Sequence, residues 1–357
     1  MIDWFSGVIQ ADASNIRPGH IVCIDPEGNV LYQKEMWSEV EGSFSNQMRC
    51  RRRVIADETQ GIWIPQGNGK PDLFTPNLLQ VSGNPSKYLQ SHNVFGPPVA
   101  ELEPVLHSVV LEIGKHIPIV YPSLGPQVSI SKSRVDIAVG IDLGSRDAVG
   151  IFLESLGHGS RTRSQRGAAI MDGKTVYWQQ HSRRWSMKAY DKYHELLGHP
   201  VHDRNLGEAL AIYSRTMVRL ELCLRGEELK AVYEKYPIVT EEVLWDYWSK
   251  IQIGGMDMER IKNLEGLPLN LRRTVLLWKD HPNVRDYMCR NTYYTHRRRI
   301  LELSSIDISV PPCDQVAVLE KVKYDKKYLM EHVLKDVPVA LQPYLFKPSL
   351  AFAFSES

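Results

Sequence analysis

Two tyrosines lie three residues apart between Ser182 and Glu195, in a segment rich in basic side chains. Tyr190 and Tyr193 flank Lys192, and the pattern predicts a strand that runs into a helix. A phenol hydroxyl is a weak nucleophile unless its charge is stabilised and its target is electrophilic. Among cations it suits attack on a phosphodiester, with Lys192 stabilising the phenolate. The alternative is a surface helix with amphipathic tyrosines.

Two predicted strands repeat one pattern of alternating side chains. In the first, Arg134 and Asp136 share a face, and in the second Arg219 and Glu221 do so, while the opposite faces are apolar. We expect the two carboxylates to hold Mg²⁺, with Mn²⁺ as an alternative, and the two arginines to hold phosphate. The alternative is a pair of amphipathic strands whose charges are solvated.

Composition allows a nucleic-acid partner although the net charge of the 357-residue chain is only +1. Arginines cluster at residues 49–53, 161–166, 183–184 and 297–299, and acid-rich stretches elsewhere offset them. The five cysteines show no CxxC spacing, which argues against a disulfide framework or a zinc knuckle. The sequence predicts no signal peptide and no membrane span.

The order of the predicted elements indicates an α+β protein. Residues 1–230 are expected to form an antiparallel sheet domain, and residues 231–357 a mainly helical domain with a helix-turn-helix-like segment. A hairpin is predicted at residues 19–33 around the turn Asp25–Gly28. A short helix is predicted at residues 85–90, with Asn84 or Ser82 as its cap.

The stretch Gly83–Gly96, which ends in His92-Asn-Val-Phe-Gly96, resembles the signature of the filamentous phage replication initiators, the gene II protein family. Four more matches follow in the order of that family: Ser133–Asp136, Thr162–Gln165, Ala189–Glu195 and Val218–Glu221. The resemblance covers residues 80–230 well and the remainder more weakly.

The resemblance implies an antiparallel-sheet nicking endonuclease that acts in rolling-circle replication. It implies that Tyr190 cleaves the viral strand at the phage origin with the help of Mg²⁺, forms a 5′-phosphotyrosine link and later rejoins the displaced strand. Tyr193 departs from the family's pattern and leaves open which tyrosine attacks. Lys87 and Arg163 are expected to contact DNA. His92 and Asn93 either orient the ion or the scissile phosphate, or His92 braces its loop.

The resemblance also implies partners and a location. Origin DNA, both double-stranded and single-stranded, and the host replication machinery are the expected partners, in the host bacterial cytoplasm. Tyr293, Arg297 and Arg298, in a predicted helix at 292–303, are expected to contact DNA. The alternative for this helix is packing through Ile300 and Leu301 with solvated arginines. The alternative for the whole chain is an origin-binding regulator without nicking activity.

Overall fold

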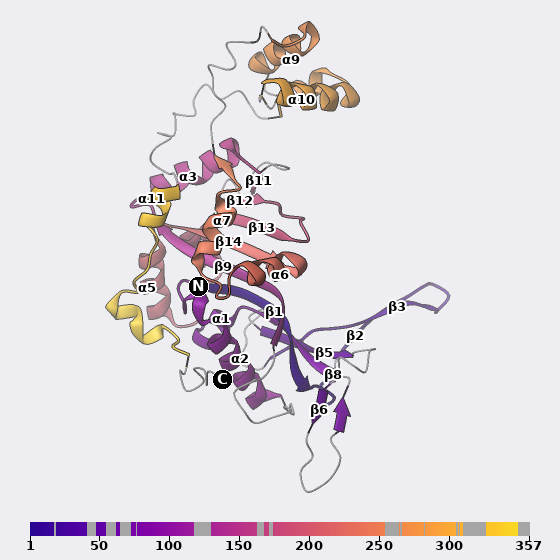
Figure 1. Ribbon diagram of the computed structural model, residues 1–357, viewed down its shortest axis with the longest axis vertical. Helices are drawn as coiled ribbons and strands as arrows, with labels where there is room; N and C mark the ends of the chain where they lie inside the picture. The colour runs from indigo at the N-terminus through magenta and orange to yellow at the C-terminus, as the bar shows by residue number, and fades with distance from the viewer. Residues whose placement is uncertain are drawn as a thin grey trace.

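Nine antiparallel strands form the central sheet of the computed structural model (Figure 1). The structure describes residues 1–17, 19–40, 48–54, 62–64, 73–75, 77–117, 130–162, 168–170, 174–253, 264, 266–281, 283–304, 306, 308–309 and 326–348. The strands follow one another across the sheet in the order β11 (Ala168–Ile170), β12 (Thr175–Trp178), β13 (Trp185–Asp191), β14 (Met217–Arg225), β9 (Ile130–Asp142), β1 (Ile2–Asp12), β8 (Asn77–Gly83), β5 (Met48–Val54) and β4 (Ser38–Glu39). The predicted α+β class is confirmed.

The middle of the sheet is buried on both faces. Strand β14 alternates apolar and polar residues, yet Met217 to Leu224 are all buried. Its apolar row (Leu220, Leu222 and Leu224) belongs to the main core together with residues of α6 (Gly226–Lys235) and α7 (Glu241–Trp248). The polar row therefore lies in the interior as well, and the alternative of solvated charges does not hold for this strand.

Helices connect and cover the strands. Those of the first part of the chain are α1 (Pro85–Gln90), the 3₁₀ helix η2 (Val99–Glu101), α2 (Leu102–His116), α3 (Arg146–Gly159), α4 (Lys192–Gly198) and α5 (Arg204–Ser214). The Asn84 side chain caps α1 by accepting the Lys87 N–H, as predicted. None of the described helices is long and apolar enough to cross a bilayer.

Three short two-stranded ladders supplement the main sheet. They are β2 (His20–Ile24) with β3 (Val30–Glu35), β6 (Ile62–Ile64) with β7 (Leu73–Thr75), and β10 (Ser160–Arg161) with β15 (Gln252–Ile253). The β2–β3 hairpin was predicted, and Gly28 occupies its turn at φ +89°. In Figure 1 this hairpin extends away from the nine-stranded sheet.

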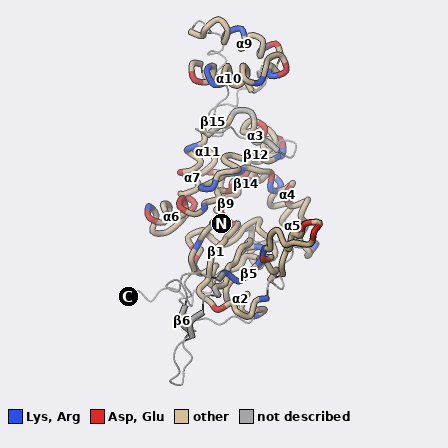
Figure 2. The backbone as a smooth tube through the Cα atoms, turned by 90° about the vertical axis from the view of Figure 1, so that its right-hand side faces the viewer, with Lys and Arg blue, Asp and Glu red and all other residues tan. Residues whose placement is uncertain are grey.

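A smaller helical unit has its own core. It contains α9 (Leu269–Asp280), the 3₁₀ helix η3 (Val284–Tyr287) and α10 (Arg290–Ser304), packed around Leu271, Val275 and Trp278. The segment Val284–Tyr287 is thus a 3₁₀ turn between two longer helices. Figure 2 marks basic positions in blue on both α9 and α10.

The boundary expected near residue 230 does not coincide with the edge of the main core. Residues of α7 and Ile251 belong to that core, and so does Leu329 of α11 (Lys326–Glu331). The chain also returns to the sheet beyond the helical unit, because Val333 bridges Ile141. The short 3₁₀ helix η4 (Val339–Tyr344) follows. The last described segment therefore packs with the sheet rather than with the helical unit.

Candidate active site

Tyr190 lies in a cavity of about 390 Å³ at the junction of β13 and α4, lined mainly by polar and charged residues. The cavity also receives side chains from β1, β14 and the segment around α1. Its lining residues are Asp3, Trp4, Asn84, Lys87, Asn93, Lys174, Thr175, Tyr177, Lys188, Tyr190, Asp191, His194, Glu195, Gly198, His199 and Glu221. Segments far apart in sequence thus meet around one phenol.

The phenol is bound by a carboxylate. The Tyr190 hydroxyl donates a short hydrogen bond to Glu221 Oε1, and the second oxygen of Glu221 pairs with Lys188 Nζ at 2.5 Å. Burial and the charge of Glu221 raise the pKa of Tyr190 well above 10. The phenol is therefore not ionised in advance, and stabilisation of a phenolate by Lys192 stays a prediction. The hydroxyl is protonated, and a base is already in contact with it.

Asn93 joins three charged residues of the site. Its amide nitrogen donates to Asp3 Oδ1 at 2.7 Å, and its amide oxygen accepts from Lys192 Nζ at 2.9 Å. Its backbone carbonyl accepts a short hydrogen bond from the guanidinium of Arg219. Because every one of these groups is buried, Asn93 fixes an acid and two cations relative to one another.

Lys192 is a fully buried cation beneath the tyrosine. Its Nζ lies 5.9 Å from the centre of the Tyr190 ring and donates to Glu195 Oε2 at 2.6 Å. Burial and the charge of Arg219 lower the pKa of Lys192 to about 8.

Asp3 is an acid of this site that sequence reasoning missed. Burial would raise the pKa of Asp3, but the charges of Arg219, Lys188 and Lys192 lower it to about 2. The signal in the sequence was an acid between Ile2 and Trp4 in an otherwise apolar start of a strand. Lys188, Glu195 and His194 of the cavity were missed as well.

Asp136 is not among the residues that line the cavity. Arg134 forms a bidentate pair with it, and the Arg134 guanidinium also lies 5.3 Å from the Trp4 ring centre. The cavity thus holds Asp3 and Glu221, and the pairing of Asp136 with Glu221 around Tyr190 stays a prediction. Burial and the charge of Asp3 raise the pKa of Glu221, so these two acids interact.

The donor set suits a hard cation. Mg²⁺ prefers one or two carboxylates and completes its shell with water and phosphate oxygens. Asp3 and Glu221 supply two such carboxylates in a cavity that also holds cations for phosphate. Among the described residues no three His, Cys, Asp or Glu side chains converge as a metal-binding group. The residues present thus fit an ion held largely by water and substrate.

Tyr193 does not share this cavity. Tyr190 lies on strand β13, whereas Tyr193 lies in helix α4, which begins at Lys192. The two tyrosines are therefore not in one helix, and helical spacing does not bring their hydroxyls together. The Tyr193 ring lies 4.9 Å from the guanidinium of Arg146, which is paired with Asp191, the N-cap of α4. Tyr193 therefore packs against the Arg146–Asp191 pair at the start of α4.

His92 braces its loop. It is buried, its ring lies 4.4 Å from that of Phe95, and its Nδ1 accepts from the Val94 N–H at 3.4 Å. Burial lowers the pKa of His92 to about 4, so the ring is neutral. Lys87 lines the cavity, with its Nζ 4.0 Å from Glu195. Arg163 lies outside the described residues.

The predicted contacts on α10 separate into two groups. Tyr293 is buried in the core of the helical unit, so its expected contact with DNA is wrong. Arg298 is exposed and lies 3.5 Å from Glu302, and Arg297 is half-buried.

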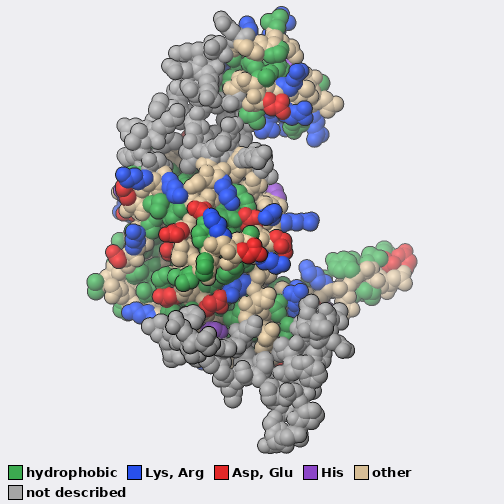
Figure 3. Space-filling view, viewed as in Figure 1, with side chains coloured by type: hydrophobic (Ala, Val, Ile, Leu, Met, Phe, Trp, Pro, Cys, Tyr) green, Lys and Arg blue, Asp and Glu red, His purple; other side chains and the backbone are tan. Residues whose placement is uncertain are grey.

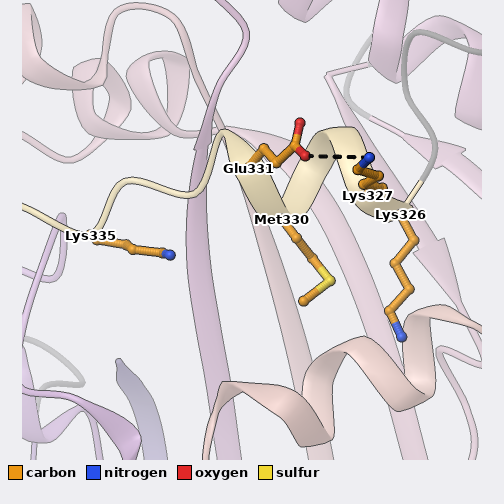
Figure 4. Close-up of a pocket in the computed structure, with 5 residues that line it drawn as sticks. All are labelled: Lys326, Lys327, Met330, Glu331 and Lys335. Atoms are coloured by element: carbon orange, nitrogen blue, oxygen red, sulfur yellow. Dashed lines mark ion pairs between the residues drawn. The ribbon is translucent and has the colours of Figure 1, made fainter.

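A second hollow lies on α11 and the segment after it (Figure 4). It is lined by Lys326, Lys327, Met330, Glu331 and Lys335, with an ion pair of 4.0 Å between Lys327 and Glu331. These five residues include no tyrosine, serine or cysteine, so the hollow lacks a hydroxyl or thiol nucleophile.

Comparisons with known proteins agree on a replication family. The model of the family described as the N-terminal part of the replication-associated protein (gene II protein) matches residues 1–241. The replication-associated protein (gene II protein) of Enterobacteria phage I2-2 is 30% identical over 325 residues, which is 87% of this chain and 88% of that protein.

Among solved structures, the chain is similar to the rolling circle replication initiator protein from Geobacillus stearothermophilus. It shares 11% identity at a TM-score of 0.31 and covers 71% of this chain and 86% of that one. A likeness this low carries no argument about the site.

Proposed function

Because the chain belongs to the family of the phage replication-associated protein, the gene II protein, we propose that it is a rolling-circle replication initiator that nicks and rejoins phage origin DNA through Tyr190. The observation that carries this proposal is the hydrogen bond from the Tyr190 hydroxyl to Glu221, inside a cavity that also holds Lys188 and Lys192 near the ring. This combination provides a nucleophile, a base and counter-charges for phosphate.

The chemistry follows from these positions. Glu221 accepts the phenol proton as the Tyr190 oxygen bonds to phosphorus. The bond from phosphorus to the 3′ oxygen breaks, that oxygen gains a proton, and the 5′ phosphate stays on the tyrosine. The reverse step rejoins a strand without a nucleotide cofactor, because the phosphotyrosine keeps an ester bond.

The cations stabilise the charge that builds on the phosphate oxygens. Lys188 is the best placed, since 31% of its side chain is exposed and its Nζ lies 4.8 Å from the Tyr190 ring centre. Arg219 is fully buried and bound to Asn93, so it acts on the site through its charge and by positioning the loop. This replaces the expectation that Arg219 grips phosphate directly.

Asp3 and Glu221 would hold Mg²⁺, or Mn²⁺ in its place. When bound, the ion polarises the phosphate and neutralises part of its charge. Removal of divalent ions with a chelator is expected to stop nicking but to leave origin binding in place. Asp3→Asn and Glu221→Gln should act in the same way, whereas Asp136→Asn should be milder because Asp136 is absent from the cavity lining.

The experiment uses supercoiled DNA that carries the cognate origin. The wild type is expected to nick it and to leave a covalent protein–DNA adduct that survives denaturation. Tyr190→Phe should bind the origin but form neither nick nor adduct, and Tyr193→Phe serves as the matched control that retains both. An adduct in Tyr190→Phe that is lost in Tyr193→Phe would transfer the nucleophile to the helix. Origin binding without any nick by the wild type would identify a regulator instead.

A further inference from the structure

The β2–β3 hairpin and its flanks, residues 19–36, form an arm with a high density of exposed apolar side chains. Exposed large hydrophobic residues of the arm are Ile21, Val22, Ile24, Val30, Leu31, Tyr32 and Met36. Within the part of the chain that the structure describes, β2 and β3 pair only with each other. A two-stranded hairpin is marginal without a further strand or a packed face, and exposed apolar patches mark interaction sites. The arm therefore needs a partner surface.

Charge is distributed unevenly along the arm. Figure 3 shows acidic side chains at its tip, apolar side chains along its length and basic side chains at its base. Asp25 and Glu27 belong to the turn at the tip, whereas Lys34 and the arginines of β5 lie at the base. Glu27, Lys34 and Arg53 are exposed, while Arg52 is paired with Glu35 at 3.4 Å.

This order identifies the kind of partner. An acidic tip opposes insertion of the arm into a nucleic acid groove, because phosphates repel it. A second arm that runs in the opposite direction matches it along its whole length. Each acidic tip then faces the positively charged base of the other arm, and the apolar stretches meet. A parallel arrangement would bring the two acidic tips together.

We infer that the arms of two copies of this chain pack antiparallel about a two-fold axis. Such an isologous contact is self-complementary, because each charge pair occurs twice. It also supplies the apolar cover that a lone hairpin lacks. An interface made by two arms alone is small, so we expect a weak, reversible dimer with a dissociation constant on the order of micromolar.

Charge reversal tests the arrangement without DNA. Sedimentation velocity over a range of protein concentrations measures the dimer dissociation constant. Glu27→Lys and Lys34→Glu should each weaken the dimer by about tenfold or more, because each places like charges together at two symmetric positions. The double variant E27K/K34E should recover the wild-type constant. An equimolar mixture of the two single variants should recover it too, because each tip then meets an opposite base.

Leu31→Ser tests the apolar stretch, and Ile212→Ser is its matched control. Leu31 is 64% exposed on the arm, and Ile212 is 77% exposed on α5. Only Leu31→Ser should weaken the dimer, and circular dichroism melting curves should show that both variants are folded. A wild type that stays monomeric at about 100 micromolar, well above the constant expected for this interface, overturns the inference. If the mixture of the two single variants still dimerises as weakly as each variant alone, the antiparallel arrangement is overturned. If Ile212→Ser weakens the dimer as much as Leu31→Ser does, the arm is not the interface.

Discussion

Lys192 links the stability of the protein to the charge of the site. Its titration predicts that rising pH increases the free energy of unfolding and decreases the nicking rate. The side chain is fully buried, and its pKa is lowered from 10.5 to about 8. The unfolded chain keeps the ordinary value, so between these two pKa values it binds more protons than the folded chain. The free energy of unfolding therefore rises with pH through this window. Below it, the folded protein bears the full cost of burying the charge.

The size of the effect follows from the two pKa values. From about pH 7 to about pH 9.5, the linkage relation gives a gain of about 2 kcal/mol for this one residue. Lys192→Met removes the titration but leaves the other titrating tyrosines and cysteines in both proteins. The difference in free energy of unfolding between wild type and Lys192→Met, measured with urea, should therefore change by that amount across the window.

Nicking should respond in the opposite direction. If the Lys192 cation stabilises the developing charge at Tyr190, the single-turnover nicking rate falls as pH rises above about 8, where the cation is lost. Lys192→Arg keeps its charge in this range and should lose that alkaline decline. A free-energy difference that stays constant from neutral to alkaline pH would refute the burial argument. Identical alkaline profiles for wild type and Lys192→Arg would refute the role of the charge.

Three further predictions concern other parts of the molecule. The pKa of Asp3 is lowered to about 2 in the folded protein. Its contribution of about 2 kcal/mol to the free energy of unfolding is therefore present above the unfolded pKa near 4 and is lost as pH falls through 2. The free energies of unfolding of wild type and Asp3→Asn, measured with urea, should converge there. Gln90 holds the Phe95 carbonyl at 2.6 Å and the Phe346 N–H at 2.8 Å; Gln90→Met should lower the nicking rate severalfold with origin affinity unchanged, and the reverse split would contradict this positioning role. Arg298→Glu should weaken origin binding and reduce its salt dependence by about one ion or more in gel-shift titrations.

Local patterns predicted the elements that carry the site. The change from strand to helix at Asp191, the Asn84 cap and the alternation of β14 all depend on neighbours within a few residues. The three arginine–acid and tyrosine segments were therefore assigned to strands and a helix start correctly. What their side chains contact depends on pairing between distant strands, which spacing does not encode.

Asp3 shows why the other contacts of the site could not be predicted from the sequence. It is a single acid with no partner at a recognisable spacing, and its contacts are to Asn84 and Asn93, more than eighty residues away. Its strand has an irregular register against β9 between Ile2 and Trp4, which changes how the intervening side chain projects. Neither this irregularity nor the partners of Asp3 can be deduced from residues 1–12 alone.

The burial of the polar face changes the chemical interpretation of the tyrosine. On a solvated face, a neighbouring lysine would lower the pKa of a phenol and prepare the phenolate in advance. In the folded protein the low dielectric and the Glu221 carboxylate act against that charge, and the pKa of Tyr190 rises. The Glu221 carboxylate accepts the hydrogen bond of the phenol. Burial raises the pKa of Glu221, which makes it a stronger base. In the proposed reaction, Tyr190 would therefore ionise only when phosphate is present, and Lys188 and Lys192 would stabilise the charge that then develops.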